Sequence, residues 1–341
     1  MNTIFVRSPF LITVNEASQV GSKIELFLWN NPNTIPTDPT YTLTKSIASA
    51  TQTENVYNVS NYCREFIKSI YPFNEEADPK PENDNNYCNL TVKRYSSIGG
   101  TYTLLDTTDY IALDGYTDYL GGYNQMSTAD VVPLFSSDIV LNLQENQQIY
   151  VNALFNVGSY TWSTFENDYD FDVLDYPKVM KLPLFYDSYY NFNEILWGEN
   201  STKVYLNEIC EAKYTPVVCS FVNRYGGWSF INFFKAQTNS IEVKGNEYNH
   251  FSESINYNIY EGQIKTFNLN GTQKVKLNTG WVVENYSELI QDLLLSEIVL
   301  LDNKPAKLIT KSTNLKTSLK DKNINYEMDF EYSYNLINNS I

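Results

Sequence analysis

The alternation of apolar and polar positions is clearest in the last stretch of the chain, from Ile324 to Tyr334. Every second residue there is apolar or aromatic: Ile324, Tyr326, Met328, Phe330, Tyr332 and Tyr334. The residues between them are polar, and three of them are acidic. Because side chains on a strand project to opposite faces with a period of two, the pattern predicts a half-buried β-strand with one aromatic and one acidic face.

Shorter runs of this kind recur along the chain, separated by Gly, Pro, Asn and Asp. They predict strands at 3–6, 10–14, 23–29, 41–43, 88–95, 102–105, 139–143, 148–155, 179–185, 204–209, 216–223, 228–236, 275–277, 298–301 and 306–310. A further strand is expected at 313–319, and a hairpin is expected to pair Ile255–Ile259 with Ile264–Asn268. Exposed loops are expected at 75–86 and 106–124, and an exposed acidic segment at 166–175. Short strands at this spacing favour a mainly β protein built from antiparallel, β-sandwich-like domains.

Two stretches carry a helical period instead and predict short amphipathic helices at about 60–71 and 285–297. In the first, Ser60 is a candidate N-cap before an apolar stripe of Cys63, Phe66, Ile67 and Ile70. In the second, Asn285 is the candidate cap, with Glu288 at the capping-box position. The apolar stripe that follows consists of Tyr286, Leu289, Ile290, Leu293 and Leu294.

The length of 341 residues allows two domains, or one large β domain with insertions. An acidic region ends near Asp175–Pro177. The sequence therefore predicts an N-terminal β-sandwich-like domain at 1–175 and a C-terminal β-rich domain with one helix at 176–341.

The charge and the aromatic content narrow the classes of partner. A formal net charge of −16 argues against ordinary binding of a phosphate backbone, which needs clustered Lys and Arg. The acid either serves solubility or forms a repulsive wall past which a polyanion can slide. The 28 Tyr and 18 Phe suit strand packing, and Tyr is also enriched at protein interfaces.

The N-terminus and the cysteines give no sign of secretion. The first residues are too mixed for the apolar region of a signal peptide, and no run approaches 18 apolar residues, so neither a signal peptide nor a membrane span is expected. Cys63, Cys88, Cys210 and Cys219 are widely spaced and lack the CxxC spacing of zinc sites. We expect reduced, buried thiols.

No residue stands out as catalytic, cofactor-binding or metal-ligating. Asp168, Asp170 and Asp172 have the spacing of the first ligands of a calcium loop, but Val173 stands where the loop needs Gly, which favours an acidic face on an exposed segment. His250 is the only histidine and cannot build a His-based metal site alone. The 40 Asp and Glu single out no carboxylate pair, and no phosphate-binding Gly motif is present. The sequence therefore predicts a protein that is not an enzyme and needs no cofactor.

Aromatic residues gather in two stretches that are expected to be exposed. These residues are Tyr110, Tyr116, Tyr119 and Tyr123 in the first stretch and Tyr186, Tyr189 and Tyr190 in the second. They could stack on sugars or anchor a protein interface, and the enrichment of Tyr at interfaces favours the second interpretation.

Several blocks of the sequence resemble virion structural proteins of short-tailed phages that infect Bacteroidota, crAss-like phages included. The blocks are Arg7–Asn15, Lys23–Trp29, Val222–Trp228, Leu277–Trp281, Ser287–Leu289, Leu293–Glu297 and Lys316–Tyr326, at both ends and in the middle of the chain. The resemblance implies a β-rich tail or collar subunit that forms a ring around the DNA channel below the portal. It implies no catalytic residues.

The function expected from the sequence is therefore that of a non-enzymatic tail ring or collar subunit, assembled in the host cytoplasm and present in the virion. Its partners would be copies of itself, neighbouring tail, ring or portal proteins, and genomic DNA that passes through the lumen without specific binding. The alternative is a carbohydrate-binding receptor or tail-fibre module, for which Tyr116, Tyr119 and Trp228 are the candidate contacts. A polysaccharide depolymerase with two carboxylates ranks third.

Overall fold

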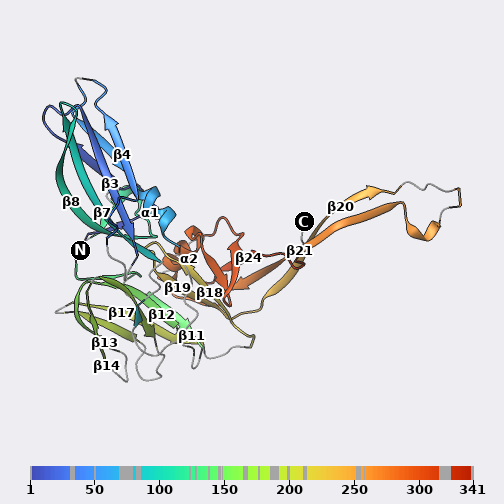
Figure 1. Cartoon of the computed structure of the whole chain (residues 1–341). Helices are drawn as coiled ribbons and strands as arrows, with labels where there is room; N and C mark the ends of the chain where they lie inside the picture. The colour runs from blue at the N-terminus through green and yellow to red at the C-terminus, as the bar shows by residue number, and fades with distance from the viewer. Residues whose placement is uncertain are drawn as a thin grey trace.

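Three β-rich units and one long projecting hairpin make up the computed structural model (Figure 1). It describes residues 2–30, 35–49, 51–68, 80–81, 86–122, 124–126, 129–136, 139–144, 147, 149–163, 168–175, 177–184, 192–197, 200–209, 213–250, 255–256, 258–314 and 324–338. The predicted fold class is confirmed: the chain is mainly β and β-sandwich-like, with two α-helices in the part described.

The N-terminal unit packs a small sheet and a helix on one face of a larger sheet. The larger sheet runs in the order β4 (Tyr41–Ser46), β3 (Gly21–Trp29), β7 (Tyr87–Ile98), β8 (Thr101–Leu113), β1 (Thr3–Phe5) and β9 (Gln125–Met126). The covering layer consists of β2 (Leu11–Asn15), β5 (Glu54–Asn58) and α1 (Ser60–Phe66). The core between the layers includes Ile12, Val14, Tyr57, Cys63, Ile24, Leu26, Cys88 and Leu90.

The middle unit consists of two sheets whose apolar faces share one core. One sheet has the order β10 (Val131–Pro133), β12 (Ile149–Phe155), β15 (Lys178–Leu184) and β6 (Lys80–Pro81). The other has the order β11 (Ile139–Leu143), β17 (Asn200–Glu208), β16 (Phe192–Trp197), β13 (Gly158–Ser163) and β14 (Asp168–Val173). Trp162 is fully buried, and its indole N–H donates to the carbonyl oxygen of Pro183 at 2.8 Å, which joins the two sheets.

Strand pairing crosses the predicted domain boundary at 175/176. β12 pairs with β15, and β13 pairs with β16, so strands from both sides of the boundary share the two sheets of the middle unit. The division at 175/176 therefore does not coincide with a gap between sheets.

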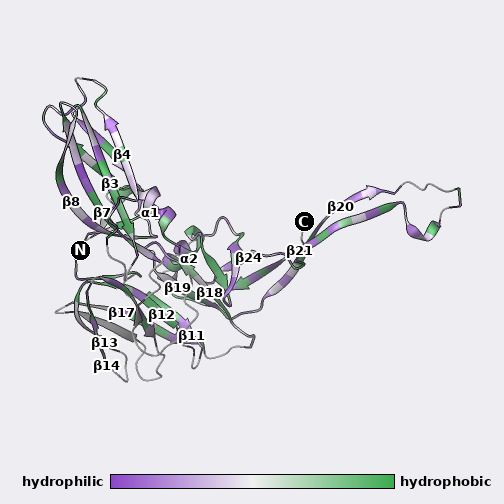
Figure 2. Cartoon of the chain, viewed as in Figure 1, coloured by the Kyte–Doolittle hydropathy of each residue, from purple (hydrophilic) through white to green (hydrophobic). Residues whose placement is uncertain are grey.

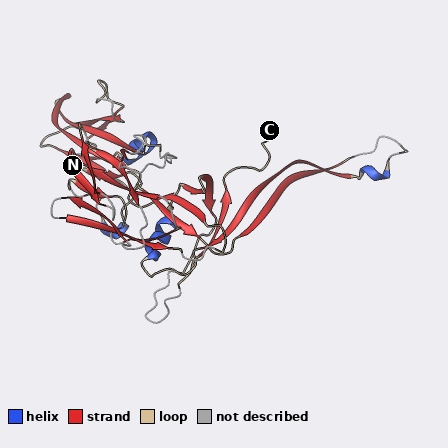
Figure 3. Cartoon of the chain, turned by 90° about the horizontal axis from the view of Figure 1, so that it is seen from below, coloured by secondary structure: helices blue, strands red, loops and turns tan. Residues whose placement is uncertain are grey.

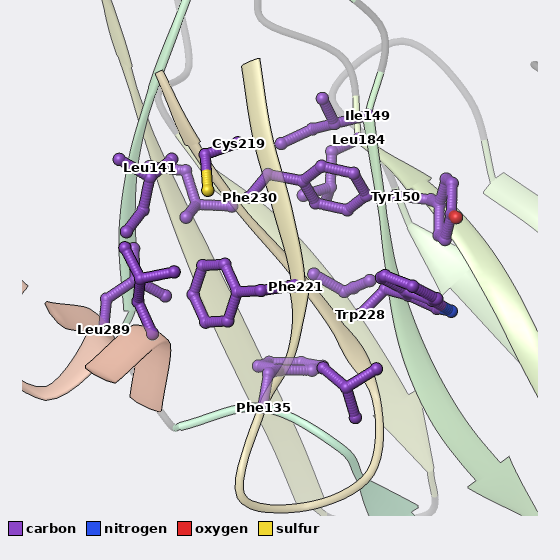
Figure 4. Packing of buried hydrophobic residues seen from close by; sticks show 14 of the residues in the cluster. Phe135, Leu141, Ile149, Tyr150, Leu184, Cys219, Phe221, Trp228, Phe230 and Leu289 are labelled. Atoms are coloured by element: carbon purple, nitrogen blue, oxygen red, sulfur yellow. The ribbon is translucent and has the colours of Figure 1, made fainter. Parts of the chain in front are cut away.

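The C-terminal unit is a fully antiparallel sheet with one helix against it. Its strand order is β19 (Trp228–Phe233), β18 (Val217–Val222), β22 (Val299–Leu301), β23 (Lys304–Leu308), β24 (Glu327–Tyr332), β21 (Ile264–Asn278) and β20 (Thr238–Asn249). Helix α2 (Tyr286–Leu295) packs against it through the stripe that the sequence predicts. In Figure 4, Leu289 of α2 lies beside Phe221 of β18, and the rings of Tyr150 and Phe230 form an edge-on pair at 5.2 Å between the middle and C-terminal units.

Both predicted helices are present but shorter than expected, and neither predicted cap forms. α1 ends at Phe66, while positions 69–71 lie outside the described residues. Ser60 is the first residue of α1, and its hydroxyl donates to the carbonyl oxygen of Ser8 at 2.6 Å and accepts from the N–H of Phe10 at 2.7 Å. Ser60 therefore connects the helix to the segment around Ser8 and Phe10 instead of capping it. Asn285 makes no side-chain cap hydrogen bond.

The remaining expectations have different outcomes, and in one of them strand pairing replaces part of an expected loop. The region expected to be a loop from 106 begins as strand, because β8 continues to Leu113 beside β7 and buries its last three residues. Positions 168–173 of the expected acidic segment form β14, and its aspartates alternate on the exposed side of this strand. The expected strand at 313–319 lies largely outside the described residues. The expected loop at 75–86 lies largely outside the described residues. The central part of the final stretch is confirmed, since Glu327–Tyr332 form a strand that buries Met328 and Phe330, and the buried Ile324 adds a single bridge with Val282. Tyr334 lies beyond the strand and is exposed.

The predicted hairpin at 255–268 is wrong. β20 pairs with β21 from Thr238 opposite Lys276 to Asn249 opposite Ile264, and residues Ile259–Glu261 form a short 3-10 helix between the strands.

Three cysteines are free and buried, as expected: Cys63, Cys88 and Cys219. Burial raises the pKa of the Cys219 thiol. Cys210 lies outside the described residues.

Candidate functional site

The outer parts of β20 and β21 form a two-stranded ribbon that extends away from the three sheets (Figures 1 and 3). We call this ribbon the arm and define it as Thr238–Asn249, Ile264–Gln273 and the described residues between them. The inner end of β21 belongs to the body instead, because Val275 and Leu277 are buried in the main core. Every residue of β20 except Glu242 is exposed.

An irregularity halfway along the arm changes its course. The regular pairing breaks between Lys244 and Asn246, and Asn268 on the opposite strand has a left-handed backbone with φ of 52°. A Cβ at Gly245 would lie 2.5 Å from the side chain of Leu269, so a larger residue here would displace that exposed side chain. Such bulges bend a strand and increase its twist.

The strand register separates the arm into an apolar face and a charged face. Ile241 lies opposite Gln273 and Val243 opposite Gly271, so these side chains share one face. Leu269, over Gly245, and Ile264, opposite Asn249, complete the apolar face. All four apolar residues are largely exposed: Ile241, Val243, Ile264 and Leu269. Figure 2 shows the alternation of hydrophobic and hydrophilic residues along the arm.

The opposite face holds ion pairs. Glu242 pairs with Lys244 at 3.4 Å and with Lys274 across the ribbon, and the two lysines lower the pKa of the Glu242 carboxyl. Farther out, Tyr248 and Phe267 form an edge-on ring pair at 5.7 Å. The charged groups on this face therefore pair with one another, whereas the side chains of the apolar face remain exposed to solvent.

The acidic face predicted for the last strand is partly neutralised at the root of the arm. Lys276 pairs with Glu327 at 2.7 Å, and Lys307 pairs with Glu331 at 2.7 Å. Lys274 also lies 3.8 Å from Glu331. These carboxylates are therefore part of a network with lysines rather than a free negative surface.

The C-terminal segment lies beside the inner part of the arm. The N–H of Leu336 donates to the carbonyl oxygen of Gly271 at 2.8 Å. The side-chain amide of Asn270 makes two hydrogen bonds with Ile337, donating to its carbonyl oxygen at 2.8 Å and accepting from its N–H at 3.1 Å. We call residues 333–338 the strap. The strap lies along the same edge of β21 as β24, beyond the end of their pairing at Lys274 and Glu331.

The described residues near the tip of the arm include strongly exposed apolar side chains. Ile255 is 99% exposed and Tyr260 90% exposed, and Ile259 beside it is also exposed. The amide oxygen of Asn258 accepts from the N–H of Tyr260 at 3.0 Å, which fixes the start of the short 3-10 helix.

A tight turn between β18 and β19 is the place where the three units meet. We call Asn223–Gly227 the junction turn. The N–H of Tyr116 in the N-terminal unit donates to the carbonyl oxygen of Arg224 at 2.8 Å. The side chain of Asn223 donates to the carbonyl oxygen of Leu134 in the middle unit at 2.8 Å. The junction turn therefore sets how the N-terminal and middle units are placed relative to the sheet that carries the arm.

The electrostatics of the junction turn centre on the ion pair between the half-buried Arg224 and the buried Asp292. The guanidinium of Arg224 lies 3.1 Å from the carboxyl of Asp292 on α2 and 3.5 Å from that of Glu288. Burial raises the pKa of Asp292 to about 6, even though Arg224 favours the charged form. Burial also raises the pKa of Tyr116 to about 12.

The hollow beside this ion pair is too small for a substrate. It measures about 110 Å³ and is lined by Ser136, Ile139, Ser229, Asn285, Glu288, Leu289 and Asp292. Pockets that hold small molecules usually measure about 300–1,000 Å³. Since Arg224 already pairs with both carboxylates, the arrangement fits a structural contact between units.

The acidic candidates of the sequence lie on an exposed strand face. Asp168, Asp170 and Asp172 alternate along β14, and the hydroxyls of Thr161 and Ser159 donate to Asp170 at 2.7 Å and to Asp172 at 2.6 Å. Within the described parts of the chain, no group of three or more His, Cys, Asp and Glu side chains could hold a metal ion. His250 is exposed at the end of β20.

The aromatic candidates do not form a common platform. Trp228 is buried in the core, and Tyr110 packs edge-on against Phe10 at 5.1 Å. Tyr116 lies under the guanidinium of Arg7 at 5.1 Å. Tyr119 is 96% exposed. The three that lie at 186, 189 and 190, together with the one at 123, are outside the described residues.

The arm itself is the feature that the sequence reasoning missed. In β20, Ile241 and Val243 alternate with polar residues, and such an alternation is typical of a strand. Two apolar residues in a polar stretch do not, however, indicate a strand that faces a core. The run from Thr238 to Asn249, opposite the predicted strand at 264–268, was the available sign.

Comparisons with known proteins add no family. The chain matches no protein-family model, and it matches none of the curated proteins with which it was compared. Among the residues described, none of the helices has the length and apolar character needed to cross a bilayer.

Proposed function

We propose that this chain is a non-enzymatic structural subunit of a phage virion, which oligomerises as a tail ring or collar around the DNA channel. The observation that carries the proposal is the arm, which presents apolar side chains to solvent well away from the body. Exposed apolar patches of this kind mark contacts with other proteins. The resemblance of the sequence blocks to virion proteins of short-tailed phages supplies the kind of assembly.

The charge of the chain is consistent with a conduit for DNA. A subunit with a net charge of −16 would repel a polyanion in the lumen rather than bind it. The exposed aspartates of β14 suit such a wall better than β24, whose carboxylates pair with lysines. The partners would be further copies of the chain, neighbouring tail, ring or portal proteins, and DNA that passes without specific binding. The subunit would reside in the virion after assembly in the host cytoplasm.

The structure around the candidate sugar contacts makes a carbohydrate-binding receptor module the less favoured function. Of the three candidate sugar contacts, Trp228 is buried and Tyr116 is covered by Arg7. Only Tyr119 remains open, beside the equally exposed Leu120, and a lone tyrosine next to a leucine suits a protein contact better than a sugar platform.

Negative-stain imaging of the purified protein, together with a glycan array, tests the proposal. We expect closed rings in the images and no glycan signal. Compact trimers that bind a glycan, with binding lost in Tyr119→Ala, would replace the ring proposal by the receptor module. Release of reducing ends from a polysaccharide would contradict the non-enzymatic part of the proposal.

A further inference from the structure

The arm lacks the burial that normally holds a hairpin in shape. A two-stranded hairpin is at best marginally stable in water unless it packs on something else. Here Val243, Ile264 and Leu269 are exposed on the apolar face, and no described part of the chain covers them. A long ribbon of this kind gains stability when another surface buries that face.

The strap shows what kind of contact the arm accepts. Leu336 and Ile337 lie along the outer edge of β21, held by the backbone of Gly271 and by the side chain of Asn270. A Cβ at Gly271 would lie 3.3 Å from both Leu336 and Ile241, so the strap reaches the apolar face at this point. Pairing along this edge stops at Asn270 in the described residues, and Ile264–Leu269 continue beyond it.

The charge distribution distinguishes between classes of partner. Residues 238–273, which contain the arm, include two Lys, four Glu and no Asp or Arg, so a net charge of −2 lies on this stretch and −14 on the rest of the chain. Such an arm offers no excess positive charge to DNA or to an anionic lipid surface. Because its net charge is small, it meets much less repulsion from the acidic body of another copy than two bodies would exert on each other.

We propose that a second copy of this chain covers the apolar face of the arm, in a contact between the arm of one subunit and the body of the next. The contact is heterologous, since the arm and the body are different surfaces. Repetition of a heterologous contact closes into a ring when the rotation between subunits permits it. The unpaired edge of β21 beyond Asn270 adds backbone pairing of the kind that extended segments use when they join a sheet. This inference rests on the proposed function and names the surface that the ring would use.

Two matched double variants test the proposal by sedimentation velocity over a range of protein concentrations. Val243→Asp with Ile264→Asp places two charges on the apolar face. Ser240→Asp with Asn246→Asp places the same two charges on the other face of the arm, at exposed polar positions. We expect the first variant to raise the dissociation constant for self-association at least about tenfold, because charges would enter a buried contact. The second should associate as the wild type does. Near-ultraviolet circular dichroism confirms that each body is folded.

The outcomes separate the arm contact from the ring. If both variants associate as the wild type does and rings form, the arm contact is overturned and the ring proposal stands. If only the first variant fails to associate but the wild type forms two-fold dimers, the arm contact stands and the ring proposal falls. If both variants lose association equally, a face-specific contact is overturned. A wild-type chain that remains monomeric at every concentration overturns both.

Discussion

Replacing the buried Asn223 of the junction turn with alanine is expected to lower the stability of the protein much more than the same replacement at an exposed asparagine. The side-chain amide of Asn223 donates to the carbonyl oxygen of Leu134 at 2.8 Å and to the hydroxyl of Ser229 at 2.9 Å. Its oxygen accepts from the N–H of Tyr225 at 2.9 Å and from the N–H of Gly227 at 3.1 Å. One buried side chain thus closes the turn and also ties it to the middle unit.

The magnitude follows from the groups that the substitution leaves without a partner. Leu134, Ser229 and Gly227 are buried, and a buried polar group that loses its hydrogen bond costs about 1–3 kcal/mol. Water that enters the vacated space recovers part of this cost. We therefore expect Asn223→Ala to lower the free energy of unfolding by about 3 kcal/mol. Asn223→Asp keeps the acceptor, but it places a carboxylate against the carbonyl oxygen of Leu134 in a buried site, so it should cost at least as much as alanine.

Urea unfolding followed by tryptophan fluorescence measures the effect, because Trp228 directly follows the junction turn and its N–H donates to Asn152 at 2.8 Å. The midpoint should fall while the slope stays constant. Asn246→Ala, at an exposed position of the arm, is the matched control and should change the free energy of unfolding by less than about 0.5 kcal/mol. An Asn223→Ala variant as stable as this control would refute the argument that the junction turn holds the units together.

Three further results are expected. The folded state raises the pKa of Asp292 from 3.8 to about 6, so the folded protein binds this proton more tightly than the unfolded chain does. Relative to Asp292→Asn, the free energy of unfolding should fall by about 3 kcal/mol as pH rises from about 3 to about 7, and a pH-independent difference would contradict this. A Cβ at Gly115 would lie 2.5 Å from a backbone oxygen of the junction turn, whereas a Cβ at Gly121 would have no neighbour within 4 Å. Gly115→Ala should therefore lower the free energy of unfolding, measured by heat or urea, by about 1–3 kcal/mol, and Gly121→Ala should leave it almost unchanged. Asn270→Ala removes both side-chain hydrogen bonds to the strap, so hydrogen–deuterium exchange at the amide of Ile337 should become faster. An unchanged exchange rate would show that other contacts hold the strap.

The sequence predicts the elements that bury one face. The alternation around Met328 and Phe330 appears as β24 with both side chains buried, and the stripe of the second helix packs as expected, with Leu289 and Leu293 in the core. These patterns are readable because burial selects one residue type for one face. The caps failed for a different reason: Ser60 found partners in a neighbouring segment that is distant in sequence.

The arm and the junction turn depend on relations that a single sequence does not display. The arm has no core-facing side in the isolated chain, so its residues carry no strong period. In the junction turn, Arg224 meets Asp292 and Tyr116 only because sheets from three parts of the chain converge there. The block Val222–Trp228 could be singled out in the sequence, but its contacts could not.

The mass of the purified chain in solution, measured by light scattering across a range of concentrations, tests the ring most directly. The account predicts that one species dominates above a threshold concentration, with a mass that is a fixed integer multiple, greater than two, of 39.3 kDa. A mass of 39.3 kDa at every concentration would contradict self-assembly, and a mass that grows without limit would show open chains instead of closed rings.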